Sequence, residues 1–167
     1  METRDRTINT NMNKETLNSV IRNRKSIYPK DYATGEIPDD IINEVLLNAN
    51  HAPTHRMTQP WFFKVYKNES KQKLINIISK IDESKISKIK HDKFIQKIND
   101  SNTIISIFLN RDKKERLPEW EEIAAVSMAV QNMWLTCYVN NIGSYWSTPG
   151  FIQEYGKLVN LDNNESS

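Results

Sequence analysis

The stretch Ala52–Tyr66, which reads APTHRMTQPWFFKVY, decides the fold of this chain. Its second part, Trp61–Tyr66, is aromatic and β-branched and therefore predicts a strand. Ahead of the stretch, apolar residues recur at helical spacing from Pro38 onward, and Pro53 ends that helix. The residues between helix and strand carry His, Arg, Thr and Gln side chains. A loop held between two rigid elements is a common place for binding groups, so this segment is a candidate site.

The rest of the sequence alternates apolar helices with a few strands. Thr103–Leu109 is a short β-branched run typical of a buried strand, and Ser144–Trp146 is expected to begin a third strand. Gly143 is expected to follow the longest helix as its C′ residue. Because strands are few and lie between helices, the sequence predicts an α+β or α/β fold in which helices outnumber strands. The expected helices cover residues 13–26, 38–51, 69–81, 85–98, 118–141 and 152–159.

The composition excludes several classes of function. The 23 Lys and Arg residues nearly balance 21 Asp and Glu residues, so the net charge of +2 gives no electrostatic reason to expect a nucleic-acid partner. One cysteine excludes a disulfide framework and a multi-thiolate metal site, and we expect no bound metal. With 4 glycines and 3 histidines, the sequence contains no GxGxxG, Walker A or HExxH motif.

The length of 167 residues predicts a single domain, residues 13–167, preceded by a flexible polar segment, residues 1–12. The N-terminal residues contain no apolar stretch typical of a signal peptide. No apolar run is long enough to span a membrane. We therefore expect a cytoplasmic protein that has no membrane partner.

A second candidate segment, residues 24–28, follows the first expected helix. Arg24, Lys25 and Ser26 place two cations and a hydroxyl in a row, which suits an anion because arginine offers a planar fork of donors. The alternative is a cationic helix end that complements the helix dipole. The loop before the first expected strand also has an alternative interpretation. It can be a solvated connecting loop without a binding role, which ends at Pro60.

A third candidate segment, residues 145–150, combines aromatic and hydroxyl side chains. Tyr145 and Trp146 precede Ser147 and Thr148, and such residues can stack on or edge a planar ligand. The alternative is that the two aromatic rings pack a turn.

Taken together, the three segments carry a resemblance. Their order and content, NRKSIY at residues 23–28, APTHRMTQPWFFKVY at residues 52–66 and YWSTP at residues 145–149, resemble the FMN-dependent nitroreductase family, in particular its small single-domain branch. The resemblance covers roughly residues 13–160, and the middle motif is the most specific of the three. It implies a homodimer with an α+β fold, in which a mostly antiparallel central sheet is wrapped by helices. It also implies two FMN sites at the subunit interface, each completed by residues of both chains.

The resemblance assigns the cofactor to three groups of residues. The first motif would hold the phosphate and polar edges of the flavin, the third would line the flavin and its ribityl chain, and the second would reach the cofactor from the partner subunit. Lys25 stands where the family usually has arginine, which keeps the charge but loses the fork geometry. Tyr28 stands where many relatives place a second cation. The implied cofactor-binding residues are Arg24, Lys25, Ser26, Tyr28, His55, Gln59, Trp146, Ser147 and Thr148.

The implied activity is that of an FMN-dependent oxidoreductase. Electrons would pass from NADH or NADPH to a nitroaromatic, quinone or similar acceptor in a ping-pong cycle of hydride transfer. The flavin carries the chemistry, so no catalytic side chain is expected. The protein would supply binding, orientation and hydrogen-bond donors near the flavin.

The end of the sequence departs from the family pattern. Relatives continue past the position of Leu161 into an apolar strand and a C-terminal extension, whereas residues 161–167 here are polar. We therefore expect a C-terminally short domain with unpaired backbone groups at a sheet edge and part of its core exposed. The alternative function is a catalytically silent or truncated family remnant that acts only as a weak flavin-binding or dimeric module. A further alternative is an unrelated α/β interaction domain.

Overall fold

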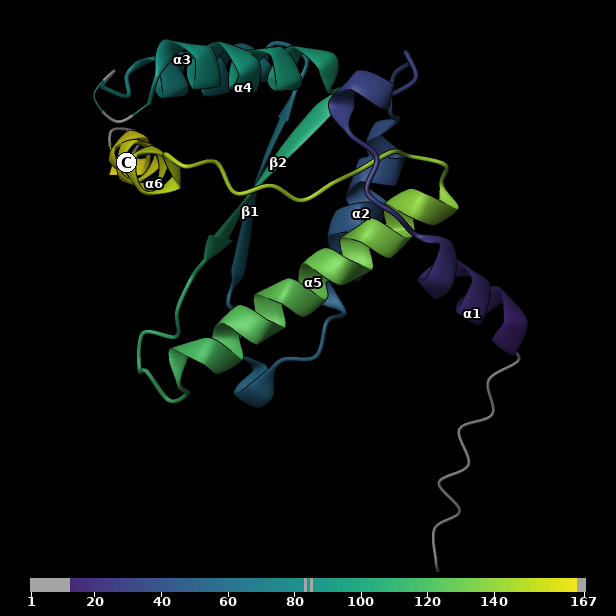
Figure 1. The fold of residues 1–167 in the computed structure, drawn as a ribbon. Coiled ribbons are helices and arrows are strands. Elements are labelled where there is room, and N and C mark those ends of the chain that lie inside the picture. Colours follow the sequence, from purple (N-terminus) through teal and green to yellow (C-terminus); the bar gives the residue numbers. More distant parts are fainter. Residues whose placement is uncertain (1–12, 83, 85, 165–167) are drawn as a thin grey trace, which may run out of the picture.

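The computed structural model describes residues 13–82, 84 and 86–164, and Figure 1 shows helices packed around two long strands. All six expected helices and the first two expected strands are present. The predicted flexible segment, residues 1–12, lies outside the described residues. In chain order the elements are α1 (Lys14–Asn23), η1 (Pro29–Asp31), α2 (Asp39–Asn50), η2 (His55–Met57), β1 (Trp61–Lys67), α3 (Ser70–Ser79), α4 (Lys88–Asp100), β2 (Thr103–Leu109), α5 (Glu119–Val139) and α6 (Ile152–Asn164).

Local chemistry sets the helix ends. The side chain of Asn13 caps α1 by accepting a hydrogen bond from the Glu15 N–H at 2.9 Å, as the sequence predicts. The helix ends at Asn23, earlier than predicted, because Arg24 leaves the helical conformation with ψ near 129°. Pro38 occupies the N-cap of α2 rather than its first helical position.

The sheet is a pair of antiparallel strands. Trp61 in β1 lies opposite Leu109 in β2, and Lys67 lies opposite Thr103. β2 has the bounds that the sequence predicts, and β1 is one residue longer than predicted. The part of the chain that the structure describes contains no other sheet. The fold is therefore α+β with a small antiparallel sheet.

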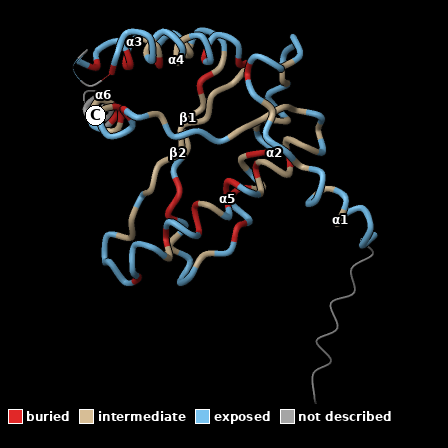
Figure 2. Tube along the Cα trace, in the orientation of Figure 1, coloured by how far each residue is buried: buried red, intermediate tan, exposed pale blue. Residues whose placement is uncertain are grey.

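Two apolar cores lie on opposite faces of this sheet, because alternate strand residues point to opposite sides. On one face, Tyr66 packs with residues of α3, α4 and α6, among them the fully buried Ile78 and Ile98. On the other face, Trp61 packs with residues of α2 and α5, including the fully buried Ala129. The buried segments in Figure 2 follow the same two layers. Each layer of helices therefore depends on the two strands between them.

The predicted role of Gly143 is wrong, because Asn141 ends α5 instead. Asn141 adopts the left-handed conformation with φ 56°, and its N–H donates to the Tyr138 carbonyl at 3.1 Å. The Ile142 N–H donates to the Cys137 carbonyl at 2.8 Å, which completes a Schellman motif. Asparagine is among the few residues other than glycine that tolerate this conformation.

The predicted third strand at Ser144–Trp146 is also wrong. Residues 142–149 form no strand or helix. The Ser144 carbonyl accepts one hydrogen bond from the Ile27 N–H at 3.1 Å and another from Trp134 Nε1 at 3.2 Å. Its partners are thus a loop and a side chain, and a strand requires a neighbouring strand to form a ladder.

The C-terminal end of the described chain is helical. The helix predicted over residues 152–159 is α6, which continues to Asn164. Among the described helices, none combines the length and apolar character needed to cross a membrane.

Gly143 has a different role, which a substitution can test. A Cβ at this position would lie 2.9 Å from Tyr32 Cδ1 and 3.2 Å from Ile27 Cγ2. We expect Gly143→Ala to lower the free energy of unfolding by about 1–3 kcal/mol, because the added methyl group overpacks this contact. Chemical denaturation measures the change.

The matched control is Gly156→Ala in α6, where an added Cβ meets no atom within 4 Å. This variant should raise the free energy of unfolding by about 0.5–1 kcal/mol, because alanine is the better helix former. Equal stability of Gly143→Ala and the unmodified chain would contradict the close contact.

Candidate functional site

The first and third candidate segments meet beside the C-terminal end of α5. Ser144 is the meeting point, since its carbonyl accepts hydrogen bonds from the Ile27 N–H and from the Trp134 indole. One residue further along each segment, the rings of Tyr28 and Tyr145 pack with their centroids 5.3 Å apart. The sequence did not indicate this pairing, because 117 positions separate Tyr28 from Tyr145.

Arg24 lies at this junction and is incompletely paired. Its guanidinium carbon is 4.2 Å from the centroid of the Trp134 ring, a distance typical of a cation–π contact. The Nη1 atom of Arg24 is buried and has no hydrogen-bond partner among the described residues. Leaving a buried charged donor unsatisfied costs free energy, and an anion that accepts from Nη1 would remove this cost. Arg24 is therefore poised to bind an anionic group.

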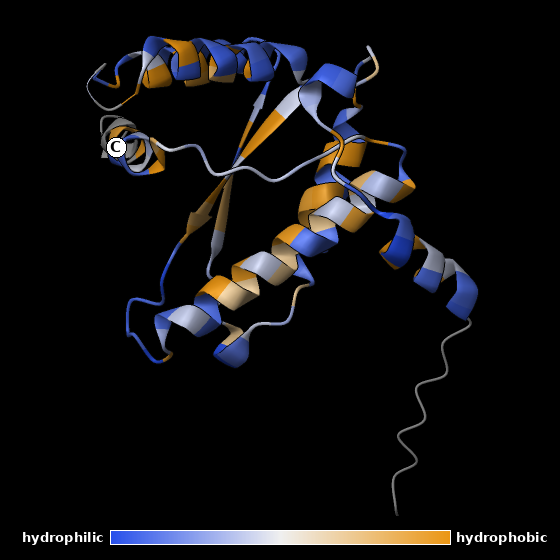
Figure 3. Cartoon of the chain, viewed as in Figure 1, coloured by the Kyte–Doolittle hydropathy of each residue, from blue (hydrophilic) through white to orange (hydrophobic). Residues whose placement is uncertain are grey.

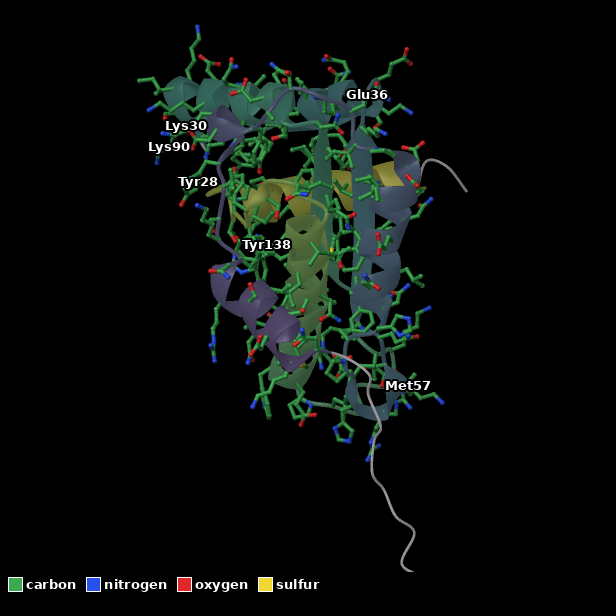
Figure 4. The ribbon with its side chains drawn as sticks, turned by 90° about the vertical axis from the view of Figure 1, so that its right-hand side faces the viewer. Tyr28, Lys30, Glu36, Met57, Lys90 and Tyr138 are labelled. Carbon is green, nitrogen blue, oxygen red and sulfur yellow. The ribbon has the colours of Figure 1, made fainter. Side chains whose placement is uncertain are left out.

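The other predicted residues of the two segments lie at the surface of the protein. Lys25 and Ser26 are exposed, as are Ser147 and Thr148. Tyr28 and Trp146 also present about half of their area to solvent, at 52% and 47%. Figure 4 shows Tyr28 directed outward from this side of the molecule. These side chains are free to contact a ligand.

One cation near this site was missed by the sequence reasoning. Lys97, in α4, places its Nζ 5.8 Å from the centroid of the Tyr145 ring. The pattern of lysines along this helix predicts a solvated face, and only the tertiary structure brings Lys97 to the third segment. It adds positive charge beside the aromatic residues.

Tyr32 and Cys137 lie close behind the third segment and stay protonated near neutral pH. Burial raises the pKa of Tyr32 to about 12, with smaller contributions from Tyr145 and Cys137. Burial also raises the pKa of the Cys137 thiol, partly offset by a hydrogen bond with Ser144. Neither group is suited to act as a nucleophile or proton carrier at neutral pH.

The middle segment forms a strained loop at the other end of α5. Three of its residues adopt positive φ, with values of 53° for Arg56, 54° for Met57 and 44° for Gln59. Such conformations cost free energy in residues other than glycine and cluster at functional sites. The His55 Nδ1 lies 2.8 Å from Glu121 Oε2, an α5 partner for which the sequence gave no indication.

One chain holds these two halves of the predicted site apart. Trp134 lies beside Arg24, and Glu121 lies beside His55. These two residues of α5 are 13 positions apart. At the rise of an α-helix this separation is about 20 Å. Figure 4 likewise places Tyr28 and Met57 far from each other. The structure therefore brings Arg24 and its neighbours together but leaves His55 and Gln59 elsewhere.

The exposed face of α5 is unusually apolar. Trp120 and Val139 expose more than half of their area, and Met128 exposes 40%. With the exposed Ala124 and the half-buried Leu135, these residues recur at spacings of four or seven along the helix. In Figure 3, orange apolar stretches of α5 alternate with pale and blue ones. Apolar residues on several faces are typical of a helix that buries more than one face.

The fold is α+β, and the site joins an unpaired buried arginine donor to exposed aromatic and hydroxyl side chains, an arrangement that suits a planar anionic ligand. The chain belongs to the Nitroreductase family, whose family model matches residues 21–167.

Relatives in sequence and structure agree with this assignment. The Bacillus subtilis (strain 168) protein named "Putative NAD(P)H nitroreductase YfhC" is 29% identical over 159 residues, which cover 89% of this chain and 78% of that protein. The nitroreductase-like family protein from Bacillus cereus superposes with a TM-score of 0.70 at 23% identity, over 90% of this chain and 80% of its own.

A second solved structure shares the fold. It is the Desulfovibrio desulfuricans "putative nitroreductase in complex with fmn", with a TM-score of 0.67 at 21% identity. The match covers 91% of this chain and 78% of that one. FMN is thus bound by a protein of this fold.

Proposed function

We propose that the protein is an FMN-dependent oxidoreductase that passes electrons from NADH or NADPH to nitroaromatic, quinone or similar acceptors. Family membership and the FMN-bound relative of the same fold support this proposal. The observation that carries it is the buried Nη1 of Arg24, which lacks a partner at the junction of the two segments. A flavin phosphate would satisfy this donor.

The first segment would bind the anionic end of the cofactor. Arg24 supplies charged donors held in place by the Trp134 ring, and Ser26 supplies an exposed hydroxyl donor. Lys25 adds a positive charge without the planar fork of an arginine. Trp146, with the adjacent hydroxyls, would line the remainder of the cofactor.

When bound, FMN would accept a hydride from the nicotinamide and return the electrons to the acceptor. The side chains of this chain would bind and orient the reactants rather than exchange protons. Tyr32 and Cys137 fit this role, because the raised pKa of each keeps it neutral behind the third segment.

We further propose a homodimer in which each FMN site uses both chains. Two α5 helices packed antiparallel through their apolar faces would bring the N-terminal end of one beside the C-terminal end of the other. His55 and Gln59 of one chain would then approach Arg24 of the other. The separation of about 20 Å within one chain supports this arrangement, as does the exposure of Trp120 and Val139.

The test of function is the visible absorption spectrum of the purified protein after FMN is added and excess FMN is removed. We expect a retained flavin spectrum and oxidation of NADH or NADPH when a nitroaromatic compound or a quinone is present. A flavin spectrum without turnover would favour the alternative of a silent flavin-binding module. A colourless protein would contradict the proposal.

Substitution of Arg24 tests the proposed phosphate contact. We expect Arg24→Ala to weaken FMN binding about 10- to 100-fold, the loss typical of a hydrogen bond to a charged group. Quenching of flavin fluorescence measures the affinity. Arg22→Ala, at an exposed position of α1, is the matched control and should leave the affinity unchanged. Equal affinities of the two variants would remove Arg24 from the site.

Substitution of Met128 tests the proposed dimer. We expect Met128→Glu to produce monomers and to weaken FMN binding, because a carboxylate would be buried in the seam between the α5 helices. Sedimentation velocity measures the association state. The control is Ile89→Glu, at a position of α4 that is 69% exposed and remote from α5. A Met128→Glu dimer as stable as the unmodified one would rule out this seam.

A further inference from the structure

His55 and Glu121 form a hydrogen bond between the strained loop and the start of α5. His55 Nδ1 lies 2.8 Å from Glu121 Oε2, and the imidazole side chain is 60% exposed whereas the glutamate side chain is 26% exposed. Figure 1 shows the short blue helix η2, which contains His55, beside the start of α5. The imidazole ring is therefore open to a ligand while its partner lies deeper in the surface.

The backbone of Glu121 is held in place by its neighbours. The next residue, Glu122, is fully buried and accepts hydrogen bonds from Arg111 Nε and from the Asp112 N–H, both at 3.0 Å. The Glu121 N–H donates to the Pro118 carbonyl at 3.1 Å. These contacts anchor the first turn of α5 to the loop after β2. A side chain on such a rigid element can orient the group that it bonds.

The loop that carries His55 is closed by hydrogen bonds of its own. The Thr58 N–H donates to the His55 carbonyl at 3.4 Å. The Gln59 N–H donates to Thr54 Oγ1 at 3.2 Å. These two backbone donors do not involve the imidazole ring, so they report separately on the conformation of the loop.

The chemistry of the pair fixes which ring nitrogen carries the proton. An ionised carboxylate only accepts hydrogen bonds, so the proton between the two side chains belongs to His55 Nδ1. When a neutral imidazole carries its proton on Nδ1, its Nε2 is an acceptor. The two ring nitrogens point in different directions, so Nε2 can meet a ligand while Nδ1 stays bonded to Glu121.

We propose that Glu121 is a positioning residue, which keeps the proton of the neutral His55 ring on Nδ1 and so makes Nε2 an acceptor for a donor group of the ligand. The inference rests on the proposed function, because FMN offers such donors in its N3–H group and its ribityl hydroxyls. In the proposed dimer this acceptor would come from one chain and Arg24 from the other. His55 would then favour the donor groups of the cofactor over its carbonyl oxygens.

The first measurement is the tautomer of His55, by long-range nitrogen–proton NMR correlation. It uses the full chain without FMN at about pH 9, where histidine side chains are ordinarily neutral. We expect the proton on Nδ1 in the unmodified protein and loss of this preference in Glu121→Ala. The exposed His51 is the internal reference and should give the same signals in both proteins. A proton on Nε2 in the unmodified protein, or the same tautomer in both proteins, would overturn the proposal.

The second measurement is the affinity for FMN, by quenching of flavin fluorescence. We expect Glu121→Ala to weaken binding about 3- to 10-fold, the loss typical of one hydrogen bond. Glu119→Ala is the matched control and should bind FMN as the unmodified protein does. Glu119 is an exposed acid in the same helix turn, and its ion-pair partner is Arg111 at 3.9 Å. No difference in affinity between Glu121→Ala and its control would remove the positioning role.

Amide hydrogen exchange distinguishes positioning of the ring from support of the loop. We expect the amides of Thr58 and Gln59 to keep their protection in Glu121→Ala. Loss of this protection together with loss of affinity would overturn the proposal, because Glu121 would then act on the backbone. If the unmodified protein retains no flavin spectrum, the proposed function fails. The tautomer in the free chain still decides whether Glu121 orients His55.

Discussion

The Ser144 carbonyl oxygen joins three distant parts of the chain by accepting hydrogen bonds from the Ile27 N–H and from the Trp134 indole. Ile27 belongs to the segment after α1, Trp134 belongs to α5, and Ser144 begins the path to α6. Arg24 rests on the same indole ring, and Tyr28 packs on the residue after Ser144. The arrangement of the cation and of the aromatic rings in this site depends on that one acceptor.

Helix α5 determines how the rest of the site is divided. Its 21 residues extend over about 30 Å. The helix carries Trp134 near one end and Glu121, the partner of His55, near the other. A rigid helix of this length prevents the two halves from meeting within one chain. The proposed completion of the site between two chains would make cofactor binding depend on association, and so on protein concentration.

The sequence predicted the elements better than their assembly. Thr103–Leu109 has the predicted bounds because a short β-branched run between polar residues has few other ways to bury its side chains. Ser144–Trp146 failed as a strand because pairing depends on a neighbour that local sequence does not reveal. Residue types and their order were enough to name the three segments as candidates. The contact between His55 and Glu121 was not, because 66 positions separate them and no periodicity links them.

The division of the interior into two cores has consequences for cooperativity. Among the described residues, the helices α3, α4 and α6 pack on one face of the sheet and α2 and α5 pack on the other, with two strands between them. Because the two helix layers are joined through a two-stranded sheet, we expect each layer to unfold locally as a separate cooperative unit. Arg24 and Trp134 belong with the α5 layer, whereas residues 144–149 connect this layer to α6. Local unfolding of the layer formed by α3, α4 and α6 would therefore keep the contact between Arg24 and Trp134. It would release α6, to which residues 144–149 are connected.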